Sequence, residues 1–152
     1  MTDVYRLVRR ERAADVLSGD GARLYGGRWN PPGTAVVYAS ESRALAVLET
    51  FVHLTLEAHH MHFLLYAITL PPRVRLQRHA PARLQRARQP SQEIGRAWIE
   101  VGAALALVVP SVLVPQETNY VLNVRHPQFA QVRIGKPERF SFDERLWRAR
   151  SL

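Results

Sequence analysis

Cysteine is absent from this 152-residue sequence, and lysine occurs only once, at Lys136. Without cysteine the chain can form neither disulfide bonds nor a thiolate zinc site, which fits a reducing compartment. Long apolar segments are also missing. The longest run covers residues 103–109, whereas a membrane-spanning helix needs about 20 apolar residues. Residues 1–16 alternate charged and apolar side chains and contain no secretory apolar core. We therefore expect a cytoplasmic protein that makes no use of a membrane.

The composition is that of a globular protein with a strong positive charge. Hydrophobic residues make up 47% and charged residues 22%, and the formal net charge is +8, almost entirely from arginine. A chain of this length can form one domain with a buried core, so we expect a single domain over residues 1–152. The charge favours an anionic partner, because guanidinium groups bind phosphates and carboxylates through two parallel hydrogen bonds. A general compositional preference for arginine would produce the same excess.

Apolar periodicity predicts an α+β fold in which a mixed sheet is flanked by helices. Strands are expected at residues 4–8, 35–39, 62–70, 105–109, 112–114, 120–123 and 132–134. Helices are expected at residues 11–17, 41–56 and 93–104, the first ended by Gly19 and the other two capped by Ser40 and Ser91. In the last of these, Ile94, Trp98 and Val101 should face inward. Residues 73–88 contain six arginines and no acidic residue, and should form an exposed basic loop with a short helical piece.

The segment from residue 26 to residue 52 carries the strongest local signal for a site. A loop rich in glycine and proline, residues 26–33, contains Arg28 and precedes the strand that carries Tyr38. Glycines allow a backbone to approach a ligand closely, and an arginine beside them can hold a phosphate or carboxylate. In the following helix, Glu49 falls on the same face as Leu45, Leu48, Val52 and Leu56. A carboxylate there is costly unless it is paired or used. A tight turn, a core tyrosine and a Glu49–Arg28 ion pair would explain the same pattern without a site.

Three other features have structural explanations beside functional ones. Ser111 lies between two apolar runs without the Gly-x-Ser-x-Gly pattern of a hydrolase, so a turn serine is the simpler interpretation. His53, His59, His60 and His62 match no zinc spacing, and we expect no metal site. The basic stretch lacks the interleaved aromatic residues that stack on single-stranded bases, so a solvated or protein-docking face is favoured over nucleic acid.

Taken in order, these motifs resemble the RES domain family, named for an arginine, a glutamate and a serine. The resemblance extends over nearly the whole chain. It rests on residues 5–7, 21–33, 37–42, 45–49, 95–98, 109–111, 119–123, 126–127 and 142–146. The sequence departs from the family pattern at Val124, where a proline usually follows the asparagine.

The resemblance implies a fold similar to ADP-ribosyltransferases and the role of toxin in a bacterial toxin–antitoxin pair. The expected partner is an Xre-type helix-turn-helix antitoxin, through which any DNA contact would be made, and the complex can include a toxin homodimer. Family members consume NAD at the nicotinamide–ribose bond, with water or inorganic phosphate as acceptor, and some transfer ADP-ribose to a protein. NAD is then the substrate, and no cofactor is expected.

The family chemistry gives each candidate residue an expected role. Glu49 would stabilise the oxocarbenium-like ribose cation, and Arg28 would hold the pyrophosphate or the ribose. Tyr38 would stack on the nicotinamide ring, and Ser111 would orient Glu49 or touch the ribose. We further expect Arg6 to contact a phosphate, and Asn119 or Asn123 to secure NAD from the facing strand. Two rival hypotheses are a ribonuclease toxin that uses the histidines and the arginine stretch, and a non-catalytic binding module.

Overall fold

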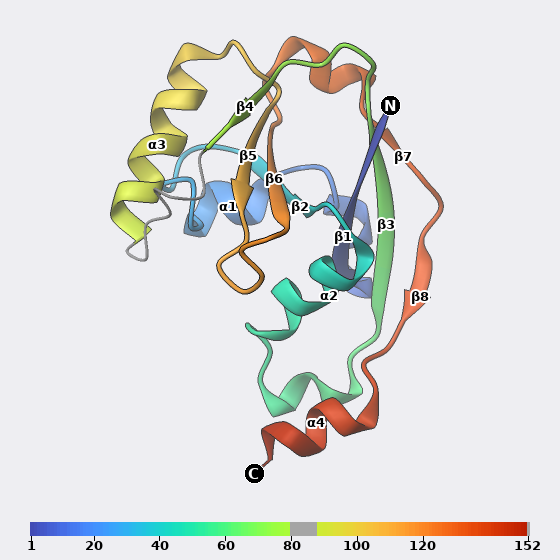
Figure 1. Ribbon diagram of the computed structural model, residues 1–152. Helices are drawn as coiled ribbons and strands as arrows, with labels where there is room; N and C mark the ends of the chain where they lie inside the picture. Colours follow the sequence, from blue (N-terminus) through green and yellow to red (C-terminus); the bar gives the residue numbers. More distant parts are fainter. Residues whose placement is uncertain (80–87, 152) are drawn as a thin grey trace.

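The computed structural model describes residues 1–79 and 88–151, and these fold around one mixed eight-stranded sheet (Figure 1). The strand order is β4-β5-β6-β2-β1-β3-β7, and β8 pairs with β3 beside this path. The strands are β1 (Thr2–Arg9), β2 (Val36–Ser40), β3 (Phe63–Leu70), β4 (Leu76–Arg78), β5 (Ala106–Pro110), β6 (Thr118–Asn123), β7 (Arg133–Ile134) and β8 (Glu138–Phe140). Among the strand pairs of the described residues, only β4–β5 is parallel. The α+β class predicted from the sequence is therefore confirmed.

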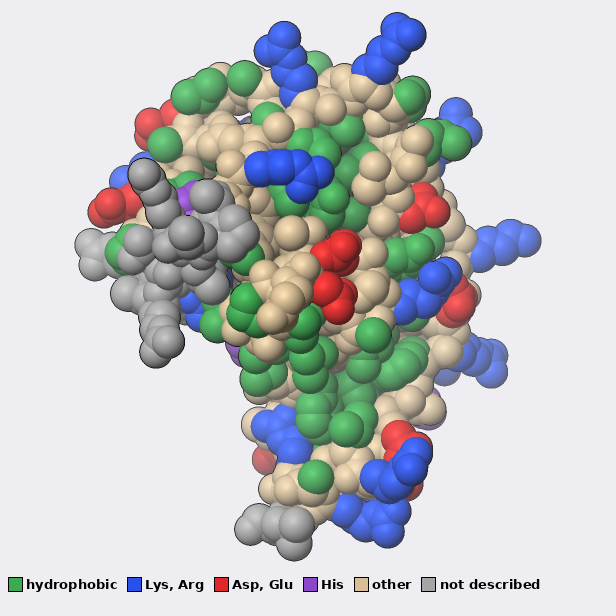
Figure 2. Space-filling model, in the orientation of Figure 1, with side chains coloured by type: hydrophobic (Ala, Val, Ile, Leu, Met, Phe, Trp, Pro, Cys, Tyr) green, Lys and Arg blue, Asp and Glu red, His purple; other side chains and the backbone are tan. Residues whose placement is uncertain are grey.

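Helices cover the sheet and extend it at one end. They are α1 (Asp20–Tyr25), α2 (Arg43–Phe51), α3 (Arg88–Val101) and α4 (Glu144–Arg150), with 3-10 turns at η1 (Arg10–Asp15), η2 (Leu56–His60) and η4 (Pro127–Gln131). None of the helices in the described residues is long and apolar enough to cross a membrane. On the face that carries α2, acidic side chains gather near the centre, basic ones project around the edge, and an apolar strip leads towards α4 (Figure 2).

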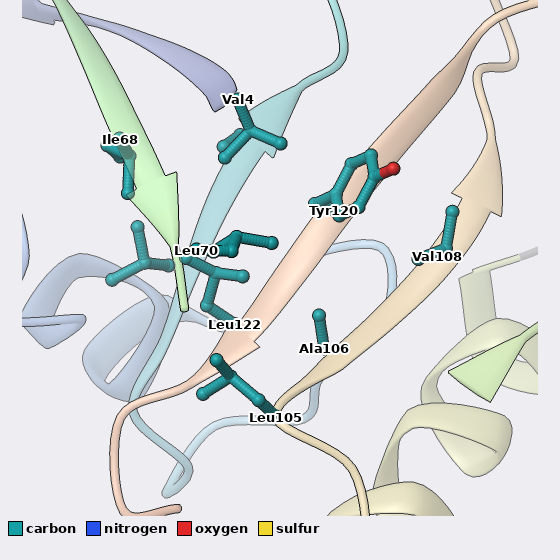
Figure 3. Packing of buried hydrophobic residues seen from close by; sticks show 10 residues of the cluster. Val4, Ile68, Leu70, Leu105, Ala106, Val108, Tyr120 and Leu122 are labelled. Carbon is teal, nitrogen blue, oxygen red and sulfur yellow. The ribbon is translucent and has the colours of Figure 1, made fainter. Parts of the chain in front are cut away.

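The sheet separates two apolar layers. Figure 3 shows side chains of β1, β3, β5 and β6 that meet on one face, among them Val4, Ile68 and Leu122, all fully buried. On the other face, Trp98 of α3 packs with Trp29 over Val121. The alternation of β6 explains this division, because successive side chains of a strand point to opposite faces.

The sheet is interrupted at its centre. Strand β1 pairs with β3 from Thr2 to Arg9, but it pairs with β2 only at Tyr5, opposite Ser40. Beyond this pair β1 and β2 diverge, and the guanidinium of Arg6 joins them: its Nη1 donates to the Tyr38 carbonyl at 2.8 Å.

The predicted bounds of α2 are wrong at both ends. Ser42, and not Ser40, caps the helix, since its side chain accepts from the backbone N–H of Leu45. The helix ends at Phe51 rather than at residue 56. The inward face also differs from the prediction: Leu45 and Ala46 are buried, whereas Leu48, Val52 and Leu56 are exposed.

Other expected elements differ in detail. In place of the expected α-helix over 11–17, residues 10–15 form the 3-10 turn η1 and residues 16–18 a further turn. Gly19, in the left-handed region at φ 71°, precedes α1 instead of ending a helix. Helix α3 begins at Arg88, so Ser91 lies within it, and Val101 at its end is exposed. Of the basic stretch 73–88, residues 76–78 form β4, while residues 80–87 lie outside the described part. The strand expected at 112–114 is a turn.

Candidate active site

Glu49 lies on α2, half-buried, and neutral donors from two other segments hold its carboxylate. Its Oε1 accepts from the Ser111 hydroxyl at 2.7 Å and from the Asn119 side-chain amide at 2.7 Å. Ser111 directly follows β5, and Asn119 is on the neighbouring strand β6. The second carboxylate oxygen, Oε2, accepts no hydrogen bond from the residues that the structure describes. One oxygen is thus fixed, and the other remains for a ligand.

The turn after β5 sets the direction of the Ser111 hydroxyl. Its Oγ accepts from the backbone N–H groups of Leu113 and Val114, at 3.1 and 3.0 Å. The lone pairs are used by these amides, so the hydroxyl proton points to Glu49. The same two bonds curl the chain back, which explains why residues 112–114 do not continue as a strand.

Ser40, which the sequence analysis treated only as a helix cap, belongs to this network. It ends β2, is buried, and donates through its hydroxyl to Asn119 Oδ1 at 2.7 Å. This bond fixes which way the Asn119 amide faces, since the oxygen must point to Ser40 and the NH2 group to Glu49. The sequence held one signal for this role: because side chains alternate along a strand, Ser40 lies on the same face of β2 as Tyr38.

Tyr38 holds the turn that carries Arg28. Its hydroxyl donates to Asn30 Oδ1 at 2.6 Å and accepts from the backbone N–H of Trp29 at 3.0 Å. Arg28 and Trp29 are the two central residues of a tight turn, closed by a bond from the Gly27 N–H to the Asn30 carbonyl. A Cβ atom on Gly27 would lie 2.6 Å from the Tyr38 hydroxyl. The fixed loop predicted from the sequence is therefore present, and Tyr38 and Asn30 are its anchors.

Replacing Tyr38 with phenylalanine tests this anchoring. The change removes two hydrogen bonds and leaves the Asn30 oxygen and the Trp29 amide without that partner. We expect a loss of about 1–3 kcal/mol in the free energy of unfolding. Chemical denaturation followed by tryptophan fluorescence measures it. Unchanged stability would show that the hydroxyl does not hold the turn.

Helix α3 presses on the same turn from the other side. Gln92 donates through Nε2 to the carbonyls of Gly27 and Asn30, at 2.9 and 3.3 Å. A Cβ atom on Gly95 would lie 1.6 Å from the carbonyl oxygen of Trp29. The helix thus contacts the turn backbone to backbone, and only glycine fits at that position.

Of the other predicted NAD ligands, Arg6 contacts the main chain of β2 and Asn123 lies away from Glu49. The described hydrogen bond of Arg6 is to the main chain between β1 and β2, and burial lowers the pKa of Arg6 to about 10, which leaves it charged at neutral pH. Asn123 lies at the opposite end of β6 from Asn119, where its Oδ1 accepts from the backbone N–H of Arg125. The gathered candidates are thus Glu49, Ser111 and Asn119, while Arg28 and Tyr38 lie on the adjoining turn and strand.

The histidines have other contacts. His59 approaches Glu144 of α4 at 2.9 Å and packs against the rings of His60 and Trp147, so it joins η2 to α4. Within residues 1–79 and 88–151, no group of three or more His, Cys, Asp or Glu side chains is placed to hold a metal ion.

A comparison with protein-family models matches residues 3–143 to the RES domain. The chain belongs to the RES domain family. A RES-family relative in Sphingobium sp. (strain YBL2), named Prs ADP-ribosylating toxin, is 37% identical, and the alignment covers 97% of this chain and 98% of that protein. A Yersinia enterocolitica protein named Toxin Res is 39% identical, with 94% of this chain and 98% of that protein covered.

The fold of this RES domain also has a solved counterpart. A chain of the Mycobacterium tuberculosis MbcT–MbcA toxin–antitoxin complex superposes with a TM-score of 0.75 at 21% sequence identity, covering 97% of this chain and 87% of that chain. The three residues that resemble the family's namesakes are Arg28, Glu49 and Ser111. In this RES domain the glutamate and the serine are in direct contact.

Proposed function

We propose that this RES domain is the toxin of a toxin–antitoxin pair and that it consumes NAD by cleaving the nicotinamide–ribose bond. The observation that carries the proposal is the carboxylate of Glu49, which has one oxygen held by Ser111 and Asn119. Both donors are neutral, so the carboxylate keeps its negative charge available. The names of the relatives in Sphingobium and Yersinia point the same way, since they describe an ADP-ribosylating toxin and a toxin.

The chemistry needs a fixed negative charge beside the ribose. When the bond between ribose C1′ and the nicotinamide nitrogen breaks, its electron pair leaves with neutral nicotinamide, and positive charge develops on the ribose. Glu49 Oε2, directed by the bonds to Oε1, would stabilise that charge and bind the ribose hydroxyls. The acceptor oxygen then forms the new bond to C1′ and releases its proton. No cofactor takes part, because NAD itself is the substrate.

Non-catalytic binding is less well supported by the contacts. That hypothesis predicts that Arg28 holds Glu49, whereas the described partners of the Glu49 carboxylate are the neutral side chains of Ser111 and Asn119. The ribonuclease hypothesis relied on the histidines, and His59 is engaged with Glu144. The arrangement around Glu49 accordingly favours the NAD reaction.

The proposal has three versions, which differ in whether water, phosphate or a protein accepts the ADP-ribosyl group. Purified protein is incubated with NAD alone, with inorganic phosphate, and with a bacterial lysate containing labelled NAD. Turnover without phosphate indicates hydrolysis, a requirement for phosphate indicates phosphorolysis, and label on a protein indicates ADP-ribosyl transfer. The name of the Sphingobium relative makes transfer to a protein the second candidate. NAD that stays intact in all three reactions would refute the proposal.

Replacing Arg28 with alanine should weaken NAD binding with a smaller effect on bond cleavage. Arg28 lies in the turn that Tyr38 of β2 anchors. Loss of a charge-assisted contact to phosphate costs about 1.5–3 kcal/mol, or roughly ten- to a hundredfold in affinity. Calorimetric titration with NAD on a Glu49→Gln background, where turnover is suppressed, measures this. Equal affinity of the two proteins would remove Arg28 from the site.

The proposed partner is an antitoxin of the Xre type that acts in the cytoplasm beside the toxin. The solved counterpart of the fold belongs to a toxin–antitoxin complex. The net charge of +8 suits an acidic partner segment. Exposed apolar side chains next to the candidate site, Leu48, Val52, Val112 and Leu113, offer it a contact surface. DNA would be bound by the antitoxin, and a toxin homodimer would form within such a complex.

A further inference from the structure

A cavity lies at the far end of β6, away from Glu49. It has a volume of about 300 Å³ and is lined by Asn123, Arg125 and His126, by residues 33–34 before β2, and by the end of α3. Asn119 and Asn123 are four residues apart on the same strand, so their Cα atoms are separated by about 13 Å. Between them, Val121 is fully buried beneath Trp29 and Trp98. An apolar layer thus separates this cavity from the candidate active site.

Asn123 supplies the decisive group. The residue is only 6% exposed and lines the cavity. Its Oδ1 accepts from the backbone N–H of Arg125 at 3.0 Å, so the amide orientation is fixed and the NH2 group takes the other side. Among the described residues, none accepts a hydrogen bond from the Asn123 side-chain nitrogen, Nδ2. This donor is therefore open to the cavity, where a ligand oxygen would complete its hydrogen bonding.

The neighbouring side chains are donors as well. His126 Nδ1 accepts from the backbone N–H of Gln128 at 3.1 Å, so the neutral ring carries its proton on Nε2. Arg125 adds an exposed guanidinium, which binds a phosphate with two parallel hydrogen bonds. None of the residues that line this cavity is acidic. The lining therefore offers several hydrogen-bond donors and no carboxylate, which suits the oxygens of an anion.

We propose that the Asn123–Arg125–His126 cavity is a binding site for a phosphate group, separate from the NAD site. The cavity is larger than a phosphate ion, so the site also has room for part of the molecule that carries the phosphate. The inference gives Asn123, which the sequence analysis assigned to NAD, a different ligand, and it goes beyond the proposed function.

Equilibrium binding of three probes tests this site. Inorganic phosphate, AMP and acetate are titrated into the wild-type protein by calorimetry. Phosphate and AMP should bind and acetate should not. Tighter binding of AMP would identify a phosphate ester as the ligand class, and equal binding would identify the free ion. The Asn123→Asp variant keeps the acceptor for the Arg125 N–H but replaces the donor with a negative charge, so both probes should bind at least tenfold more weakly.

Matched variants exclude indirect effects. Arg125→Ala should weaken binding, whereas Arg133→Ala, which removes the same charge from an exposed position on β7, should not. Glu49→Gln should leave phosphate affinity unchanged even if NAD turnover is lost, which separates this site from the proposed function. The proposal is overturned if neither phosphate nor AMP binds, if acetate binds as tightly as phosphate, or if wild type and Asn123→Asp bind equally.

Discussion

Replacing Glu49 with glutamine is expected to lower the rate of nicotinamide release from NAD by about a hundred- to a thousandfold, the usual effect of removing one preorganised electrostatic group. Glutamine has the same shape, and its Oε1 can still accept from Ser111 and Asn119, which hold Glu49 Oε1 at 2.7 Å. The variant should therefore fold normally and lose only the negative charge that faces the ribose.

Two controls give this result its meaning. The thermal unfolding midpoint of Glu49→Gln should match that of the wild type, so that lost turnover is not lost structure. Ser111→Ala removes one of the two bonds to Oε1 while leaving the charge, and its loss of rate should be smaller than that of Glu49→Gln. If Glu49→Gln released nicotinamide at the wild-type rate, another residue would have to carry the reaction.

Of all glycine-to-alanine substitutions in this chain, Gly95→Ala is expected to lower the free energy of unfolding the most. The new Cβ would lie 1.6 Å from the carbonyl oxygen of Trp29 and 2.7 Å from its carbonyl carbon. Both are main-chain atoms of a turn fixed by Tyr38 and Gln92, so they cannot move aside independently. Helix α3 must then shift away from the turn, at a cost of about 3 kcal/mol or more.

Thermal unfolding checks this prediction. A loss of 3 kcal/mol should lower the midpoint by roughly 6–12 °C in a domain of this length. Gly21→Ala is the matched control: Gly21 lies in the exposed helix α1, and a Cβ there has no atom within 4 Å. That change should leave stability unchanged or raise it by up to about 1 kcal/mol. Equal midpoints for Gly95→Ala and the wild type would contradict the close contact between α3 and the turn.

The strands were predictable because their apolar residues are adjacent or alternate, and six of the seven expected segments coincide with β1, β2, β3, β5, β6 and β7. The bounds of α2 were not, because both Ser40 and Ser42 suit a helix cap. Only the pairing of β2 with β6, which places Ser40 opposite Asn119, shows that Ser40 still belongs to the strand.

The candidate site was predictable residue by residue but not as an arrangement. Glu49 could be singled out by its position on a helix face, whereas its contacts with Ser111 and Asn119 join residues 62 and 70 positions apart. Arg6 and Asn123 were assigned to NAD because they belong to shared motifs. Their places depend on the divergence of β1 from β2 and on the length of β6, which local sequence patterns do not encode.

The measurement that tests the central claim most directly is chromatography of NAD incubated with the purified wild-type protein, free of any partner. The account predicts free nicotinamide in amounts that exceed the protein many times over when an acceptor is present, and release about a hundred- to a thousandfold slower with Glu49→Gln. NAD recovered intact with water, phosphate and cell protein as acceptors would contradict it.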